Sequence, residues 1–131
     1  MSSIFTRIVE GDIPSYRIAE DDRFYAFLDI NPLAKGHTLV IPKEETDYLF
    51  DLEDGLLGDM MIFAKKVAKA IDQTMVCKRV GIAVLGLEVP HAHIHLVPIN
   101  DLYDIEFSKP KLKLSQDEFE DIAARIRAAL D

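Results

Sequence analysis

The segment "PHAHIHLVP" (residues 90–98) decides the interpretation of the chain, because it combines a strand pattern with three histidines. His91, His93 and His95 alternate there with apolar residues. Side chains on a strand point alternately to the two faces of the sheet. The pattern therefore predicts a half-buried strand whose histidines share one face, about 6.5–7 Å apart from one to the next. We call these three residues the histidine strip.

Three interpretations of the histidine strip are open. Ordinary polar residues on a solvent face are disfavoured, since the strip holds three of the chain's four histidines. A metal site is a second possibility, but three rings on a straight strand span about 13 Å, so only two of them plus a remote carboxylate would fit one ion. We favour phosphate chemistry, in which a neutral imidazole attacks a phosphoryl group while neighbouring rings stabilise the oxyanions. Repulsion between imidazolium charges predicts neutral rings beside at most one or two charged ones near pH 7.

The residues before and after the strip predict strands in an antiparallel sheet. Residues 24–30 and 37–42 are rich in apolar and β-branched side chains and enclose the turn signals of Asn31–Gly36, which indicates a hairpin. Residues 79–89 and 91–99 predict two further adjacent strands, with a bend at Gly86 or Pro90.

Two helices are predicted between and after these strands. Apolar residues recur at three- and four-residue spacing from Leu52 to Ile71, with Asp51 as the expected N-cap. A second helix is expected to begin at Ser115, where Glu118 three positions later completes a capping-box pattern. Hairpin strands with separately grouped helices indicate a single α+β domain over residues 1–131.

Composition restricts the classes of function. With 49% hydrophobic and 29% charged residues the chain suits a globular domain, and its net charge of -8 argues against a nucleic-acid partner. No apolar run is long enough to predict a membrane partner, and the N-terminus shows no signal peptide. The single cysteine, Cys77, excludes an intrachain disulfide. We therefore expect a cytoplasmic protein.

The motifs resemble one known family. "HAHIHLVP" matches the His-Φ-His-Φ-His-Φ-Φ signature (Φ is apolar) of the histidine-triad (HIT) nucleotide-binding family. The stretches "IFTRIVEGDIPSYRIAEDDRFYAFLDINPLAKGHTLVIPKE" and "GLEVPHAHIH" resemble the family as well, so the similarity covers about residues 4–98 and leaves 100–131 as an extension with a helix. The resemblance implies a HIT-like fold, with a five-stranded antiparallel sheet, one long helix and a C-terminal helix, and a homodimer.

The resemblance also implies an activity and catalytic residues. It implies cleavage at the α-phosphate of purine nucleoside phosphoramidates or dinucleoside polyphosphates, through a covalent nucleotidyl-histidine and without a cofactor. His93 would attack the phosphorus, and His95 would contact phosphate oxygens. His91 would support the hydrogen-bond network, and His37 of "GHTLVIP" would join the same site.

The remaining expected site residues bind the nucleotide. By resemblance, Asp29 binds the ribose hydroxyls, although its carboxylate suits a cap of the Asn31-Pro32 turn as well. Gly86 and Glu88 lie at positions that contact the phosphate or the leaving group. Six apolar residues match the base-binding wall, or are plain core: Ile4, Phe5, Ile8, Phe27, Ile30 and Leu39.

Several residues depart from the family pattern. The lead-in "KRVGIAVLGLEV" contains no asparagine, and Leu87 replaces the usual glutamine. Glu88 stands where many members have serine or threonine, and its carboxylate repels phosphate unless it is protonated or faces an amine leaving group. These changes favour an alternative, a nucleotide-binding or signalling module with little turnover. Ser3 and Thr6 occupy the positions of zinc-binding cysteines in some members, so we expect no metal.

Overall fold

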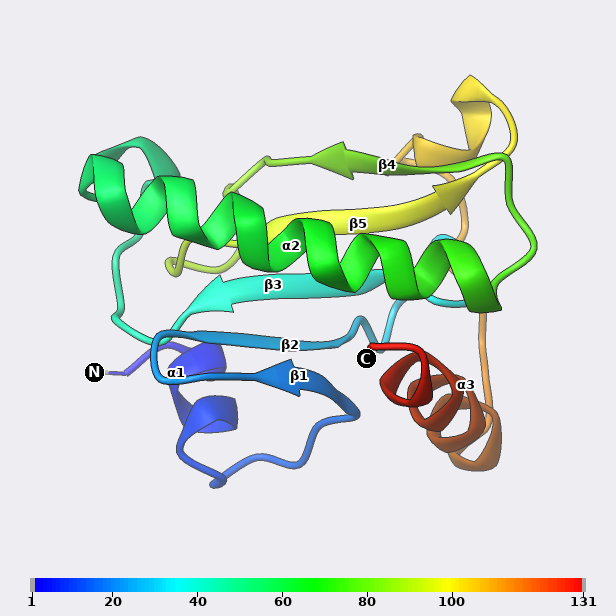
Figure 1. Ribbon diagram of the computed structural model, residues 1–131, viewed down its shortest axis with the longest axis horizontal. Coiled ribbons are helices and arrows are strands. Elements are labelled where there is room, and N and C mark those ends of the chain that lie inside the picture. Colours follow the sequence, from blue (N-terminus) through cyan, green and yellow to red (C-terminus); the bar gives the residue numbers. More distant parts are fainter. Residues whose placement is uncertain (1, 131) are drawn as a thin grey trace.

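A five-stranded antiparallel sheet forms the centre of the protein (Figure 1). The structure is a computed structural model that describes residues 2–130. Its strands are β1 (Arg17–Glu20), β2 (Phe24–Leu28), β3 (Thr38–Pro42), β4 (Arg79–Ala83) and β5 (Ile94–Ile99). They lie in the order β1-β2-β3-β5-β4, and every neighbouring pair is antiparallel. The expected α+β fold and the hairpin of β2 and β3 are confirmed.

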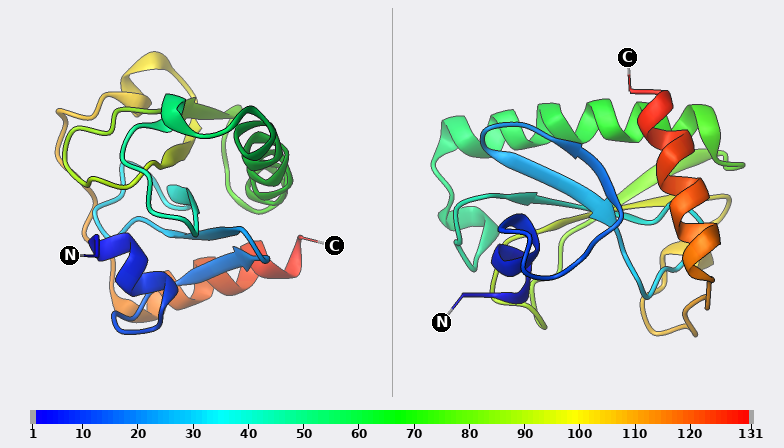
Figure 2. Two further views of the ribbon diagram at one scale, coloured as in Figure 1. Left: turned by 90° about the vertical axis from the view of Figure 1, so that its left-hand side faces the viewer. Right: turned by 90° about the horizontal axis from the view of Figure 1, so that it is seen from below.

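Three α-helices cover parts of the two faces of this sheet. They are α1 (Ile4–Val9), α2 (Asp54–Thr74) and α3 (Gln116–Ala128), and two short 3₁₀ turns, η1 (Leu49–Asp51) and η2 (Leu102–Ile105), complete the described elements. α2 runs across one face, and α3 packs against the same core near β1 (Figures 1 and 2). α1 packs on the opposite face. Within residues 2–130, no helix is long and apolar enough to cross a membrane.

The two long helices follow the sequence patterns, with one correction. The three- and four-residue spacing in α2 buries Met60, Ala64, Val67 and Ile71 against the sheet. The expected N-cap of α2 is wrong, because Asp51 ends η1 and the N-cap is Glu53, whose side chain makes no capping bond. α3 begins as predicted. The Ser115 hydroxyl oxygen accepts from the Glu118 amide, and the Glu118 carboxylate accepts from the Ser115 amide.

The sheet separates a large core from a small one. The large core lies under α2 and α3 and includes every second residue of the segment before and within β5, namely Ala92, Ile94 and Leu96. The small cluster on the other face consists of Phe5, Tyr25, Phe27, Leu39 and Ile41. Because α1 is short, it covers only part of this second face, and the remaining part is where the candidate site lies.

The histidine strip differs from the predicted strand. β4 ends at Ala83 rather than at residue 89, and a loop with Gly86 at a φ of 72° follows it. β5 begins only at Ile94, so His91 and His93 precede the strand. They are held by the loop and by the chain after β3, since the Ala92 amide donates to the Thr46 carbonyl at 2.6 Å. The alternation still directs the apolar residues into the large core.

Candidate active site

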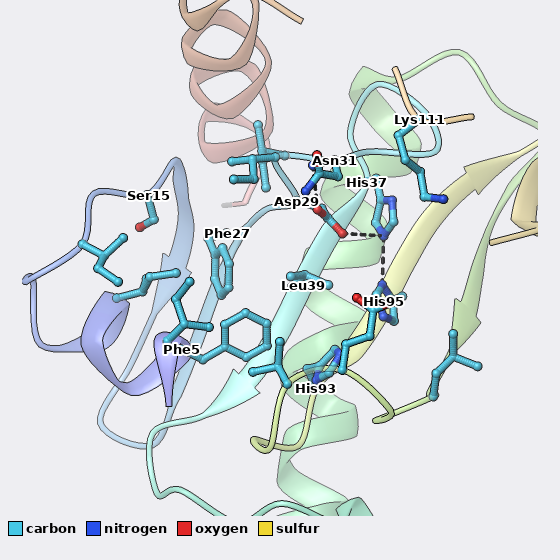
Figure 3. A pocket seen from close by; sticks show the side chains of 18 of the residues that line it. Phe5, Ser15, Phe27, Asp29, Asn31, His37, Leu39, His93, His95 and Lys111 are labelled. Carbon is cyan, nitrogen blue, oxygen red and sulfur yellow. Dashed lines mark hydrogen bonds and ion pairs between the residues drawn. The ribbon is translucent and has the colours of Figure 1, made fainter. Parts of the chain in front are cut away.

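A pocket of about 400 Å³ opens on the face of the sheet that α1 partly covers. It is lined by all the expected site residues except His91: Ile4, Phe5, Ile8, Phe27, Asp29, Ile30, His37, Leu39, Gly86, Glu88, His93 and His95. Figure 3 shows Phe5 and Phe27 on one side, and Asp29, His37 and His95 on the other. The pocket thus has an apolar half and a polar half. Its residues come from four separate parts of the chain, which the fold brings together.

The hydrogen bonding of His93 selects one tautomer of its neutral ring. Its Nδ1 lies 2.8 Å from the carbonyl oxygen of His91. A carbonyl oxygen only accepts, so Nδ1 must carry the proton of the neutral ring and Nε2 keeps its lone pair. The edge-on ring of Phe5, at 5.1 Å between centroids, packs against the imidazole. The local fold therefore holds His93 in the tautomer that a nucleophile requires.

His37 and His95 form a directed hydrogen-bond chain. The amide of Leu33 donates to Nδ1 of His37 at 3.0 Å, so His37 carries its proton on Nε2. That Nε2 lies 3.0 Å from Nδ1 of His95 and donates to it (Figure 3). His95 in turn must carry its proton on Nε2. The chain begins at a main-chain amide and ends at an N–H group that lines the pocket.

Burial keeps these two rings neutral. Burial, with a smaller effect of the neighbouring imidazoles in the same direction, lowers the pKa of His37 to about 3 and that of His95 to about 4. The centroids of His93 and His95 are 5.0 Å apart, closer than strand spacing predicts. Desolvation thus keeps both His37 and His95 neutral near pH 7. The expectation of at most one or two charged rings in the histidine strip stays a prediction.

His91 lies behind the pocket and connects three segments. Its Nε2 donates to the Pro42 carbonyl at 2.7 Å, which leaves Nδ1 to accept from the Ser3 hydroxyl at 2.8 Å. Ser3 is also the N-cap of α1. Glu45 accepts from the Ser3 amide and from the Thr6 hydroxyl, both at 2.6 Å. This network fixes the residue whose carbonyl sets the tautomer of His93.

Asp29 caps the turn after β2, and its expected contact with a ribose stays a prediction. One oxygen accepts from the Asn31 amide at 2.8 Å, which caps the turn after β2. The other lies 3.6 Å from Nε2 of His37 and lines the pocket (Figure 3). Burial raises the pKa of this carboxyl. Turn capping therefore leaves one carboxylate oxygen for a ligand.

The sequence did not predict several residues around the pocket. Phe107 and Lys111 line it, although residues 100–114 showed no periodic pattern and no family motif. Ser15 and Asn31 line it as well. Neighbours of this kind meet only through the tertiary fold, and the one available signal was the basic character of "SKPKLK" in an acidic chain.

The donor sets do not suit a metal ion. Asp29, His37 and His95 offer ligand atoms within 4.8 Å of one another. However, Nδ1 of His37 accepts from Leu33, so a neutral His37 carries a proton on Nε2 and has no lone pair for a metal. At the positions that the family resemblance relates to zinc-binding cysteines, Ser3 and Thr6 carry hydroxyls in place of thiolates, and these hydroxyls donate to His91 and Glu45. The expected absence of a metal stays a prediction.

Comparisons with known proteins agree with this fold. The family model for the HIT domain matches residues 10–102. The adenosine 5'-monophosphoramidase hnt1 of Schizosaccharomyces pombe is 38% identical over 134 residues, covering 97% of this chain and all of that protein. The crystal structure of a HIT-like protein from Bartonella henselae, involved in cell-cycle regulation, has a TM-score of 0.85 at 31% identity, covering 98% of this chain and 96% of the other.

A second solved structure is equally close in fold. A zinc-bound histidine triad family protein from Mycobacterium smegmatis has a TM-score of 0.82 at 34% identity, covering 99% of this chain and 94% of the other. These matches span the histidine strip and the "GHTLVIP" segment. The chain belongs to the histidine triad (HIT) family.

Proposed function

We propose that the protein is a nucleotide hydrolase that cleaves purine nucleoside phosphoramidates or dinucleoside polyphosphates at the α-phosphate. The observation that carries the proposal is the pair formed by the free Nε2 of His93 and the Nε2–H group of His95 beside an apolar pocket. HIT membership and the relative named adenosine 5'-monophosphoramidase support hydrolase activity. A phosphoramidate also suits the rim, where an amine leaving group would face the exposed Glu88 carboxylate.

The pocket suggests how a nucleotide would bind. The base would lie between the apolar side chains of α1 and those of β2 and β3, near Phe5 and Phe27. The free oxygen of Asp29 would accept from a ribose hydroxyl. This orientation brings the α-phosphate to the polar half, next to His93 and His95.

The proposed reaction has two steps at one phosphorus. Nε2 of His93 forms a bond to the α-phosphorus while the bond to the leaving nitrogen or oxygen breaks, and His95 Nε2–H donates to a phosphoryl oxygen. Nδ1 of His93 keeps its proton and donates to the His91 carbonyl, which stabilises the positive charge that develops on the ring. The leaving nitrogen or oxygen takes up a proton from solvent, and the water that attacks in the second step returns one. Water then attacks the same phosphorus, releases the nucleoside monophosphate and restores His93. With a phosphoramidate, water is consumed and the monophosphate and an amine are produced.

Replacement of His93 tests the nucleophile. We expect His93→Ala to lower turnover of adenosine phosphoramidate and diadenosine polyphosphates by about a thousandfold or more, because the covalent route is removed. Acid quenching followed by mass spectrometry should detect a nucleotidyl adduct on the wild type only. A protein with the exposed Lys113 replaced by glutamine serves as the control. Equal turnover of wild type and His93→Ala would contradict the proposal.

The lead-in loop favours one alternative, a binding or signalling module with little turnover. In residues 84–90 the only polar side chain is Glu88, which accepts hydrogen bonds rather than donating them when ionised. A leaving group would therefore meet no side-chain donor from this loop. Tight nucleotide binding by the wild type, with neither product nor adduct in the same assay, would favour the module.

We also propose a homodimer. β4 is an edge strand of the sheet, so one row of its main-chain hydrogen-bonding groups lacks a strand neighbour. Apolar side chains lie exposed on and after it, among them Ile82, Val84, Leu85 and Leu87. Pairing of two β4 strands would continue the sheet across a twofold axis and cover these side chains.

A further inference from the structure

A segment from the C-terminal part of the chain borders the polar half of the pocket. Residues 106–112, here called the rim segment, lie between η2 and α3. The amide of Leu112 donates to the Pro32 carbonyl at 2.9 Å, which attaches the segment to the turn between β2 and β3. The ring of Phe107 packs edge-on against His95, with centroids 4.7 Å apart. The rim segment lies beyond residue 102, where the family match ends.

The rim segment holds the ammonium group of Lys111 in place. Lys111 Nζ donates to the main-chain carbonyl of Phe107 and, at 3.0 Å, to that of Lys109. An ammonium group has three N–H donors, so one remains for another acceptor. Among residues 2–130, no carboxylate forms an ion pair with Lys111, whereas Lys109 pairs with Asp104 at 3.8 Å. Lys111 is thus oriented by neutral carbonyls rather than by a carboxylate.

The positive charge of Lys111 distinguishes it from the other residues that line the pocket. Lys111 is the only lysine or arginine among the pocket-lining residues, which include the carboxylates of Asp29 and Glu88. Burial lowers the pKa of His37 to about 3 and of His95 to about 4, so neither ring supplies a cation near neutral pH. The charge of Lys111 reaches the site, because it opposes the rise that burial causes in the pKa of Asp29 and adds to the fall that burial causes in the pKa of His37. In a chain of net charge -8, an anionic ligand needs such a local cation.

We propose that Lys111 binds the α-phosphate oxygens of the nucleotide, as the one lysine or arginine that lines the pocket. Figure 3 shows its side chain beside His37, on the polar side of the pocket and away from Phe5 and Phe27. The inference rests on the proposed function, since it takes the ligand to be a nucleoside phosphate. It assigns phosphate recognition to a residue outside the histidine motifs, while the bond-forming step stays with His93.

Calorimetric titrations with adenosine and with AMP separate the phosphate from the nucleoside. We expect Lys111→Gln to bind AMP about tenfold or more weakly than wild type, since a charge-assisted hydrogen bond is lost, and to bind adenosine unchanged. The AMP affinity of the wild type should fall with added salt more steeply than that of the variant. Lys113→Gln, which removes the same charge from an exposed position two residues away, should behave as wild type.

Other outcomes of the titrations overturn the inference. Equal AMP affinity of wild type and Lys111→Gln, or a parallel loss of adenosine and AMP binding, would contradict it. If glutamine disturbs the rim segment, Lys111→Met keeps the aliphatic stem and gives the same comparison, and Lys111→Arg should restore the AMP affinity. A wild type that binds neither AMP nor adenosine contradicts the proposed function itself. If the wild type binds both, the comparison with Lys111→Gln tests the role of Lys111 alone.

Discussion

Each of the four histidines has its proton placed by a main-chain group. His93 Nδ1–H donates to the His91 carbonyl and His91 Nε2–H donates to the Pro42 carbonyl. The Leu33 amide sets the tautomer of His37 and through it that of His95. The sequence predicted that these rings act together. It did not predict their tautomers, because these depend on how the turn before β3 and the loop before β5 fold and on the approach of Pro42 to His91.

Acid should destabilise the protein through the buried rings. An unfolded histidine has a pKa of about 6.5, whereas burial lowers the pKa of His37 to about 3 and of His95 to about 4. Between these values the unfolded chain binds more protons, so the stabilisation is complete above about pH 6.5 and is lost as the pH falls. We expect the free energy of unfolding to drop by roughly 1–2 kcal/mol per histidine from pH 7 to pH 5.

Urea unfolding at several pH values measures this loss. His37→Gln should reduce the pH dependence, because one of the two buried imidazoles no longer titrates. Burial raises the pKa of Asp29, so that carboxyl acts in the opposite direction at more acidic pH. An unfolding free energy that stays constant between pH 7 and pH 5 would mean that the two rings are as easily protonated in the folded state as in water.

At the scale of elements, α1 acts on the site in two ways. Phe5 packs against both Phe27 and His93, and Ser3 at its start bonds to His91. α1 is too short to be stable alone, so its position depends on these contacts. No element was predicted for residues 4–9, since six residues show too little periodicity to distinguish a helix from a strand.

Replacement of Ser3 separates capping from catalysis. Ser3→Ala should cost about 1 kcal/mol of stability through loss of the N-cap of α1. It should also lower turnover, because Nδ1 of His91 loses its donor and the carbonyl that orients His93 becomes less constrained. Ser115→Ala removes the N-cap of α3, far from the pocket, and should cost similar stability without affecting turnover. Identical activity losses in the two variants would assign the effect to stability alone.

At the scale of the whole molecule, long periodic segments were predictable and short ones were not. The hairpin of β2 and β3, α2 and α3 follow from apolar spacing and capping residues. β1 was missed because its four residues carry two charges and lie at the sheet edge. The predicted strand over residues 79–89 extended too far, since the left-handed Gly86 and the following Pro90 interrupt pairing in a segment that is otherwise strongly apolar.

The edge strand gives a prediction about assembly. Ile82 in β4 is 48% exposed, and a lysine there would place charge within the proposed dimer interface. We expect Ile82→Lys to shift the protein from dimer to monomer in sedimentation velocity experiments at micromolar concentration. Val76→Lys, at a 98% exposed position before β4, is the matched control and should leave the dimer intact. A wild type that sediments as a monomer would refute the proposed homodimer.

The rim segment has a consequence for inhibitor selectivity. Proteins that share all four histidines offer a small molecule almost the same polar contacts, so a compound directed at those rings alone would inhibit many of them. Phe107 lies within van der Waals range of His95 but outside the residues matched by the family. A compound that binds the histidines and extends an aromatic group onto Phe107 would therefore discriminate between this protein and HIT proteins with a different residue there.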